Sequence, residues 1–311
     1  MNQTDKIYIA GHNGMVGSAI VRLLKKCGFN NLVMRSRKQL DLKDYADVGH
    51  FFEAEKPDVV ILAAARVGGI QANIDYPGEF LYENLAIQNN VIHQSYLHRV
   101  KKFCFLGSSC IYPKECSQPM KEEYVLTGPL EPTNEGYALA KISGLKMVQF
   151  YRKQYGFNGI CVIPCNLYGT NDSFDLVHSH VLSALVKKFV DAVDSGTKDV
   201  VIWGTGNARR EFMHVDDAAE AILFLIEHYD LPQIINIGWG KDVSIKELAL
   251  LIAEKTGFKG DLVWDTSKPD GMLRKCMDVS RMKAIGYMPK ITLEEGVQKT
   301  IEEYRVLLSH R

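Results

Sequence analysis

The sequence lacks an excess of either charge. Its 311 residues include 37 basic and 37 acidic side chains, so the formal net charge is zero. Nucleic acids and acidic membrane surfaces attract cationic proteins, and this balance predicts neither as a partner. The chain also has no apolar run near the roughly 20 residues that span a bilayer. Its first six residues lack the apolar stretch of a secretory signal, so we expect a cytoplasmic protein.

The sequence also lacks cysteines and histidines at the spacings typical of metal sites or disulfide frameworks. The seven cysteines are an odd number and form no C-x-x-C pair. This spacing predicts neither a disulfide framework nor a zinc site, and each cysteine is expected as a small buried side chain. The histidines, including His12, His50, His93 and His178, show no spacing typical of metal ligands. No metal site is therefore predicted.

What the chain does have is a regular alternation of short β-branched runs and helical stretches over its first 165 residues. Buried strands are expected near 7–10, 31–34, 59–63, 102–106 and 159–163. Helices are expected from the first strand to about Cys27, and then near 45–55, 79–98 and 137–155. This rhythm is typical of an α/β fold with a doubly wound parallel sheet, the Rossmann architecture, which binds ligands at the carboxyl ends of its strands.

The alternation changes after Asn166. A loop is followed by an expected helix near 181–192 and short strands near 200–203 and 234–237. A further helix is expected from about Ser244, where Glu247 completes a Ser-x-x-Glu capping box. We interpret these segments as a smaller lobe interleaved with returns to the main sheet.

Three glycines follow the first expected strand directly and open the first helix. Such glycines allow a tight turn and a close approach to a pyrophosphate, whose charge then meets the helix N-terminus. Their position between strand and helix favours a dinucleotide over a mere turn. The expected contacts are Gly11, His12, Asn13, Gly14, Met15, Val16 and Gly17.

The end of the second expected strand distinguishes two dinucleotides. An NAD-binding chain usually carries an acidic residue there, whereas this chain reads Arg35-Ser36-Arg37. A guanidinium presents a fork of donors to a 2′-phosphate, so Arg37 favours NADP(H); a solvated basic pair is the alternative. Asp41 and Asp44 are assigned to the turn and to the start of the next helix.

Tyr137 and Lys141 are one turn apart on an expected helix, so both side chains project from one face. An ammonium near a phenol favours the phenolate, and we expect it to lower the pKa of Tyr137 toward that of a general acid/base. Ser108 follows an expected strand, and its hydroxyl can donate a hydrogen bond to the same substrate carbonyl oxygen as Tyr137. Asn134, three residues before the tyrosine, is expected to cap the helix.

These residues, together with the segment Arg210-Glu211-Phe212-Met213-His214, resemble the extended short-chain dehydrogenase/reductase family. The segments 63–70, 107–113 and 131–138 are most similar to members that act on GDP-4-keto-6-deoxy-D-mannose, and the similarity runs nearly end to end. The resemblance implies epimerisation at carbons 3 and 5 and then NADPH-dependent reduction at carbon 4. His214 and the aspartates after it are expected to be structural.

The resemblance also implies roles for individual residues. Inversion of a carbon needs proton transfer on both faces, and the family's acid/base pair corresponds to Cys110 and His180. The implied catalytic set is then Ser108, Cys110, Tyr137, Lys141 and His180. Further cofactor contacts are implied for Leu106, Gly107, Ser108, Ser109, Lys141, Pro164, Asn166, Leu167 and His180. Substrate contacts are implied for Lys188, Trp203, Arg210 and Asp270.

The implied ligands give the predicted domains and partners. Residues 1–170 and 213–240 would bind NADP(H), and residues 171–212 and 241–311 would bind the GDP-sugar. The resemblance also implies a homodimer, which we expect through the helices near 79–98 and 137–155. The alternatives are another nucleotide-sugar 4-epimerase, dehydratase or reductase on this scaffold, and a non-catalytic NADP(H)-binding regulatory protein.

Overall fold

A computed structural model describes residues 1–175, 179–268 and 270–309, so His178 lies outside the described residues. Its centre is a six-stranded sheet in the order β10-β5-β4-β3-β1-β2, and every pairing in this sheet is parallel. These strands are β1 (Ile7–Ala10), β2 (Leu32–Val33), β3 (Val59–Leu62), β4 (Lys102–Leu106), β5 (Gly159–Pro164) and β10 (Ile235–Ile237). The expected parallel sheet is confirmed.

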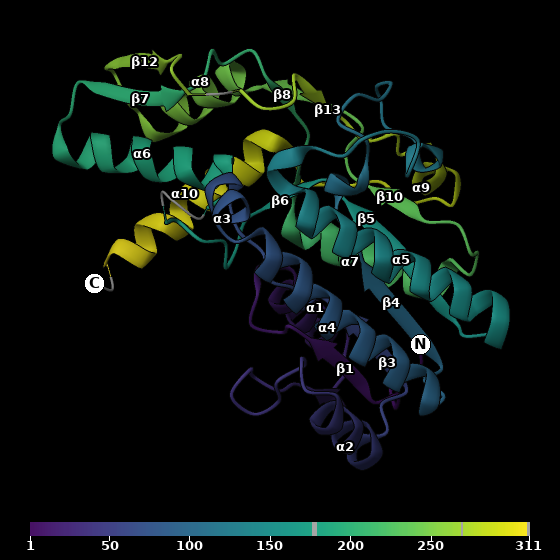
Figure 1. Ribbon diagram of the computed structural model, residues 1–311. Coiled ribbons are helices and arrows are strands. Elements are labelled where there is room, and N and C mark those ends of the chain that lie inside the picture. The colour runs from purple at the N-terminus through teal and green to yellow at the C-terminus, as the bar shows by residue number, and fades with distance from the viewer. Residues whose placement is uncertain (176–178, 269, 310–311) are drawn as a thin grey trace.

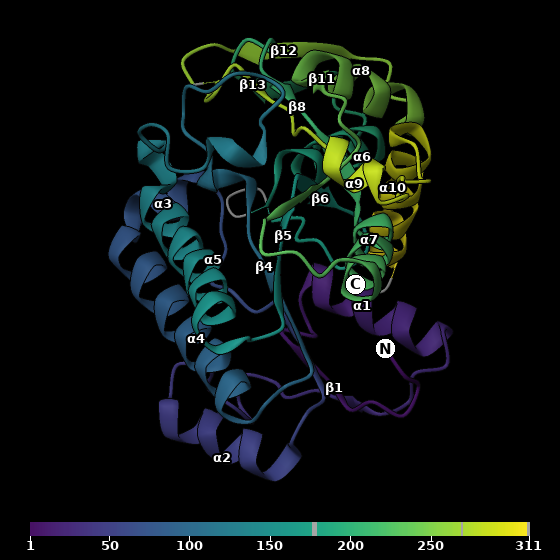
Figure 2. The same ribbon diagram turned by 90° about the vertical axis from the view of Figure 1, so that its right-hand side faces the viewer.

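Helices cover both faces of this sheet (Figure 2). One face carries α2 (Tyr45–Glu55), α4 (Pro77–Leu97) and α5 (Glu135–Tyr155), and the other carries α1 (Met15–Lys26) and α7 (Val215–His228). The short α3 (Ile70–Asp75) precedes α4, and α9 (Ser280–Ala284) lies beside β10. The architecture is therefore doubly wound, as expected.

A smaller lobe lies beyond the carboxyl ends of the sheet strands (Figure 1). Its helices are α6 (Val181–Ser195), α8 (Ile245–Thr256) and α10 (Leu293–Ser309). Its strands form small sheets: β7 (Asp199–Trp203) with β12 (Asp261–Asp265), and β8 (Arg209–Arg210) with β11 (Val243–Ser244) and β13 (Arg274–Lys275). Between the lobes, β6 (Asn166–Tyr168) pairs with β9 (Phe212–His214).

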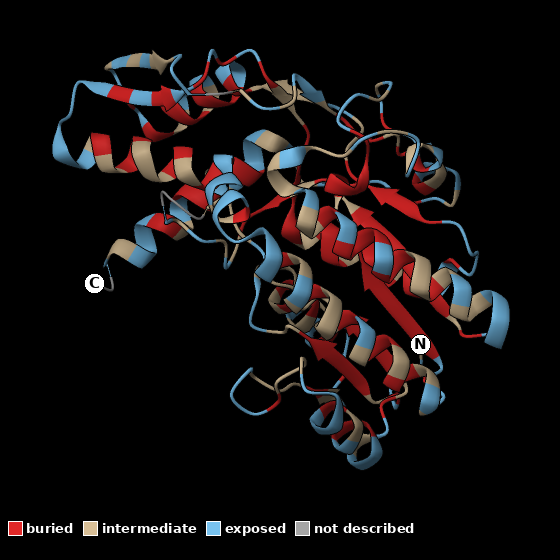
Figure 3. Ribbon diagram, in the orientation of Figure 1, coloured by how far each residue is buried: buried red, intermediate tan, exposed pale blue. Residues whose placement is uncertain are grey.

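Two separate clusters of buried apolar side chains support the two lobes. The larger cluster fills both sides of the main sheet, whose strands are buried almost throughout (Figure 3). The smaller cluster joins α6, α8 and α10, with Phe189 and Ile252 fully buried in it. Residues 277–287 contribute Met282 and Tyr287 to the larger cluster, although the sequence division places them in the smaller lobe.

The local signals of the sequence account for most element boundaries. β1, β4 and α2 have the expected limits, and α8 begins with the expected capping box between Ser244 and Glu247. Several elements were not expected, namely α3, α9, α10, β8, β11, β12, β13 and the β6–β9 pair. The strands of that pair have three residues each and come from segments more than 40 residues apart, so no local pattern announces them.

Candidate active site

The glycine turn after β1 leaves its middle glycine free to face a ligand. A Cβ on Gly11, whose φ is +88°, would lie 2.6 Å from the nitrogen of Ala64, and one on Gly17 would lie 2.1 Å from the carbonyl oxygen of Gly11. A Cβ on Gly14 would meet only that same oxygen, at 3.5 Å. Gly14 is also the N-cap of α1 and makes no side-chain cap, so the helix N-terminus is available to an anion.

Two arginines follow β2, Arg35 and Arg37, and they make different contacts. Arg35 pairs with Glu55 and stacks on Phe51, 5.8 Å from the ring centroid. Arg37 is more open: 72% of its side chain is exposed, and its ion pair is a 3.6 Å contact with Glu83. Asp44 caps α2 by accepting a hydrogen bond from the amide of Asp47, as the sequence predicts.

Lys141 connects the helix α5 to the end of strand β4. Its Nζ donates a hydrogen bond to the carbonyl oxygen of Leu106 at 2.8 Å and lies 5.8 Å from the ring centroid of Tyr137. The Tyr137 side chain interacts with the hydroxyl of Ser108 and with Cys110. Ser108 in turn accepts a hydrogen bond from the amide of Cys110 at 3.4 Å. Four of the five expected catalytic residues thus meet at one strand end.

The expected lowering of the pKa of Tyr137 is wrong in direction. Burial raises the pKa of Tyr137 well above that of an ordinary tyrosine; the neighbouring Cys110 raises it further, and only the hydrogen bond with Ser108 opposes them. Burial also lowers the pKa of Lys141 from 10.5 to about 8. Removal from water destabilises both charged forms, which accounts for the direction of both shifts. The geometry therefore suits Tyr137 as a proton donor.

Cys110 is buried, and a lysine that sequence reasoning missed lies near it. Burial raises the pKa of the Cys110 thiol, while the positive charge of Lys275 is the largest influence that lowers it. Lys275 ends β13 beside Arg210 and has its own pKa lowered by burial. Only the pairing of β13 with β8, which brings together segments 65 residues apart, places this cation there.

His180 stands at the N-cap of α6 with 52% of its side chain exposed. Its Nδ1 lies 3.5 Å from Oδ1 of Asp172, and this contact raises the pKa of the imidazole. Asp172 is a second residue that the sequence left unassigned; it also accepts a hydrogen bond from Ser183. Across the described ranges, no hydrogen bond or charge interaction joins His180 to Cys110 or Tyr137. His180 therefore makes its side-chain contact with Asp172 rather than with the group at β4.

The other expected cofactor contacts follow β4 and β5. Gly107 packs so closely that a Cβ there would lie 2.3 Å from Cδ1 of Ile163, and Ser109 is buried in a short 3-10 turn. Pro164 ends β5. Asn166 begins β6, and its side-chain Nδ2 donates a hydrogen bond to the carbonyl oxygen of Glu211 at 2.9 Å. Leu167 points into the larger apolar cluster.

The expected substrate residues belong to elements of the smaller lobe. Arg210 is half-buried and donates to the carbonyl oxygens of Arg209 and Met272, and burial lowers its pKa. The carboxylate of Asp270 accepts two hydrogen bonds from Thr205, at 2.8 and 2.7 Å. These contacts fix both side chains before any ligand binds.

Trp203 offers an apolar surface between two cations. Trp203 is 60% exposed, and the Nζ atoms of Lys188 and Lys268 lie 6.0 and 5.4 Å from the centroid of its ring. Burial lowers the pKa of Lys188, which also donates to the carbonyl oxygen of Val201. An exposed aromatic face flanked by cations suits a heterocyclic base attached to phosphates.

Glu211 is a further residue whose task the sequence did not reveal. Its carboxylate is fully buried and accepts hydrogen bonds from the amides of Gly240 and Met277, both at 2.7 Å, with Trp239 as a third backbone donor. Burial raises its pKa to about 7 despite these donors. Glu211 therefore fastens the β10–β11 loop and the end of β13 next to Arg210 and Lys275.

Two structural expectations have different outcomes. His214 is buried and accepts a hydrogen bond at Nδ1 from the amide of Asp216, which is the packing expected of a structural histidine. Asn134 does occupy the N-cap of α5, but its side chain makes no cap hydrogen bond. The Oδ1 of Asn134 and the Nδ1 of His12 are buried without a hydrogen-bond partner among the described residues. Such orphaned atoms beside the glycine turn and Tyr137 fit a site that a polar ligand completes.

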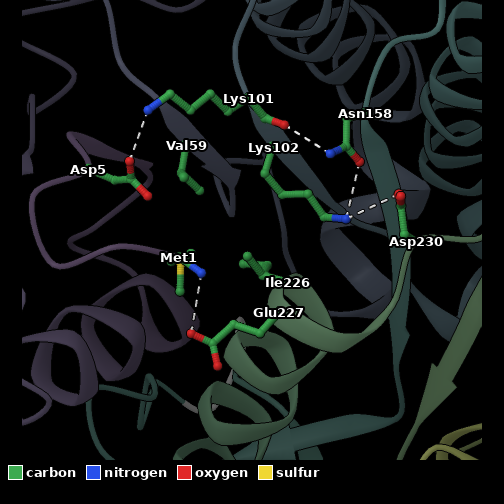
Figure 4. Close-up of a pocket in the computed structure, with 9 residues that line it drawn as sticks. All are labelled: Met1, Asp5, Val59, Lys101, Lys102, Asn158, Ile226, Glu227 and Asp230. Atoms are coloured by element: carbon green, nitrogen blue, oxygen red, sulfur yellow. Dashed lines mark hydrogen bonds and ion pairs between the residues drawn. The ribbon is translucent and has the colours of Figure 1, made fainter.

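A cavity of about 300 Å³ lies at the opposite, amino end of the sheet strands (Figure 4). Its charged groups are already paired with one another: Lys101 with Asp5, Lys102 with Asp230, and the amino group of Met1 with Glu227. Over residues 1–175, 179–268 and 270–309, no group of three potential metal ligands occurs, and no helix is long and apolar enough to cross a membrane.

Comparisons with known proteins agree with this geometry. Residues 7–238 match the model of the NAD dependent epimerase/dehydratase family. The chain is 53% identical over 303 residues to GDP-L-fucose synthase 1 of Arabidopsis thaliana, which covers 97% of this chain and 94% of the relative. It is also similar in structure to a GDP-6-OMe-4-keto-L-xylo-heptose reductase from C. jejuni, with a TM-score of 0.94, 40% identity and 99% of each chain covered. A GDP-L-fucose synthetase from Naegleria fowleri bound to NADP has a TM-score of 0.91 at 28% identity, covering 99% of this chain and 96% of that one.

Proposed function

The chain belongs to the NAD dependent epimerase/dehydratase family, and we propose that it converts GDP-4-keto-6-deoxy-D-mannose to GDP-L-fucose with NADPH. The observation that carries the proposal is the meeting of Ser108, Cys110, Tyr137 and Lys141 at the carboxyl end of β4. A reductase needs only the serine, tyrosine and lysine of this group. The buried thiol adds an acid/base group beside the same carbonyl.

The residues around the glycine turn fit NADP(H). The free N-terminus of α1 at Gly14 would hold the pyrophosphate, Lys141 the nicotinamide ribose, and Arg37 the 2′-phosphate. When bound, NADPH supplies the hydride that reduces carbon 4. The orphaned nitrogen of His12 supports a polar ligand in this place.

Epimerisation follows from the two carbons that flank the ketone. Cys110 acts from its thiolate form, which the charge of Lys275 favours, and removes the proton from one of them. The resulting enolate oxygen receives hydrogen bonds from Tyr137 and Ser108. His180, whose pKa is raised by its hydrogen bond with Asp172, returns a proton from the opposite face.

Reduction uses the same phenol in a second task. Because burial raises the pKa of Tyr137, the hydroxyl remains protonated and can donate to the oxygen at carbon 4 as the hydride arrives. Lys141 holds the helix end against Leu106 and presents its charge to the developing alkoxide.

The smaller lobe would bind the GDP part of the substrate. Arg210 would bind the diphosphate and Trp203 with Lys188 the base, while Asp270 would position the turn at Thr205. We assign 171–212 and 241–311 to the substrate lobe, except for residues 277–287, which pack in the larger cluster, and 1–170 and 213–240 to the NADP-binding domain. A cytoplasmic location is proposed because nucleotide-sugar chemistry with NADPH takes place there.

A homodimer is proposed through α4 and α5, which lie side by side on the outside of the sheet (Figure 2). Large apolar side chains are exposed along them, including Tyr82 at 69% and Phe150 at 62%. Leu139 and Phe150 are eleven residues apart and so project from one face of α5. A second copy of the same face would bury them.

The test is to incubate the purified protein with NADPH and GDP-4-keto-6-deoxy-D-mannose and to follow absorbance at the nicotinamide band. Oxidation of NADPH that depends on the sugar supports the proposal, and Tyr137→Phe should lower its rate about 10²- to 10⁴-fold. Absence of oxidation by the unmodified protein would reject the assignment in favour of an NADP(H)-binding regulatory protein.

A further inference from the structure

One carboxylate oxygen is shared by two cations at the carboxyl end of β2. Oε2 of Glu83 lies 3.6 Å from Nη2 of Arg37 and 3.8 Å from Nζ of Lys43. Both contacts are longer than a hydrogen bond, so they are loose ion pairs. The cations come from the loop between β2 and α2, and Glu83 comes from α4.

Glu83 itself is fixed by a third partner. Its other oxygen, Oε1, lies 2.6 Å from Nη1 of Arg66, and only 14% of the Glu83 side chain is exposed. Arg66 also pairs with Glu79 at 2.6 Å. Glu83 is therefore held mainly by Arg66, through Oε1. Its second oxygen, Oε2, makes only the two looser ion pairs with Arg37 and Lys43.

The backbone holds Lys43 in this position. Its amide donates to Oδ1 of Asp41 at 3.1 Å, and the amide group of Asn90 on α4 donates to the carbonyl oxygen of Leu42 at 3.0 Å. The side chain is 26% exposed, and among the described residues its other carboxylate partner is Asp41, at 3.9 Å and 45% exposed. Lys43 is thus a part-buried cation held by the fold beside Arg37.

We propose that Lys43 is the second cation of the 2′-phosphate site, and that Oε2 of Glu83 occupies the place of one phosphate oxygen until NADP(H) binds. A 2′-phosphate carries more charge than one carboxylate and has three acceptor oxygens, so it replaces two loose contacts with charged hydrogen bonds. Glu83 stays on Arg66 during this exchange. Lys43 then determines the preference for NADPH over NADH.

The inference rests on the proposed cofactor, and its test uses binding alone. NADPH and NADH are titrated separately into the full-length protein, with nicotinamide fluorescence as the readout, for the unmodified chain, Lys43→Gln, Lys43→Arg and Lys38→Gln. Lys38 is an exposed neighbour in the same loop and serves as the matched control. Unfolding curves of each variant show whether the fold is retained.

Lys43→Gln is expected to weaken NADPH binding about tenfold, the effect of one charged hydrogen bond, and to leave NADH binding unchanged. Lys43→Arg should restore most of the loss, and Lys38→Gln should change neither affinity. Equal weakening of both nucleotides, or no change in NADPH binding, would overturn the inference. Failure of the proposed reaction is distinguishable, because it would appear as NADPH binding without turnover.

Discussion

The Nζ of Lys141 donates to the carbonyl oxygen of Leu106 at 2.8 Å, which ties the helix of the catalytic tyrosine to the strand of the catalytic serine. Burial at this contact lowers the pKa of Lys141 to about 8. The cation is present below that pH and is lost above it, so we predict that kcat/KM for reduction falls above pH 8. The pKa of Tyr137 is raised, and its phenol stays protonated throughout this range.

Lys141→Arg tests the origin of this alkaline limb. An arginine keeps its charge at pH 10, so the variant should have a lower plateau and no decline between pH 8 and 10. Lys153→Arg, an exposed position on the same helix, should retain the decline of the unmodified enzyme. A decline that persists unchanged in Lys141→Arg would assign the titration to another group.

Substitutions at two glycines of the first turn are expected to affect different properties, NADPH affinity at Gly14 and stability at Gly17. Gly14→Ala places its Cβ 3.5 Å from the nearest atom outside its own neighbourhood, so the fold should tolerate it while the affinity for NADPH falls about tenfold or more. Gly17→Ala places its Cβ 2.1 Å from the carbonyl oxygen of Gly11, and the variant should lose several kcal/mol of stability, at least about 2 to 3. Thermal unfolding and NADPH titration of both proteins separate the two effects. Equal thermal stability of the two variants would argue against the packing role of Gly17.

Glu211 predicts a pH dependence of stability. Its pKa in the folded protein is about 7, raised from an ordinary 4.5 by burial. Between these values the folded protein binds more protons than the unfolded chain, so the contribution of this group to the free energy of unfolding decreases as pH rises from 4.5 to 7. The loss is roughly 3 kcal/mol at most.

The measurement is urea unfolding at pH 5 and pH 7.5. The free energy of unfolding of the unmodified protein, relative to Glu211→Gln, should be lower at pH 7.5 than at pH 5. Glu254→Gln, at an exposed position on α8, should show no such difference. The same pH dependence in the unmodified protein and Glu211→Gln would mean that this carboxylate does not titrate in the window.

The apolar face of α5 predicts the oligomeric state. Phe150→Glu puts a charge in the proposed interface between copies and should shift the protein from dimer to monomer in sedimentation velocity. Leu250→Glu, which alters a side chain of similar exposure on α8, should leave the dimer intact. A Phe150→Glu protein that still sediments as a dimer would exclude this face.

Much of the fold could be predicted because its signals are local. A β-branched run such as Ile7–Ala10 needs no partner to be identified, and the capping box of Ser244 and Glu247 lies within four residues. Among the missed elements, strands such as β6 depend on distant partners, whereas α10 is a long helix within one segment. β6 is strand only because β9 pairs with it, and α3 has six residues and no side-chain cap.

The site divides in the same way. The spacing of Tyr137 and Lys141, and their neighbour Ser108, could be interpreted from the sequence because they lie on one helix and one strand end. Lys275 and Glu211 reach the site through the pairing of β13 with β8 and through a loop 29 residues away, which no spacing reveals. The pKa of Tyr137 was predicted in the wrong direction because burial is a property of the folded state.

The central claim is that Cys110 and His180 exchange protons at the carbons beside the ketone before Tyr137 completes the reduction. The most direct test is to run the reaction in D2O with NADPH and to analyse the nucleotide-sugar product by NMR. The account predicts GDP-L-fucose with deuterium at carbons 3 and 5, and Cys110→Ser or His180→Gln should reduce that incorporation. A product reduced at carbon 4 that keeps the original configuration at carbons 3 and 5, with no deuterium there, would contradict it.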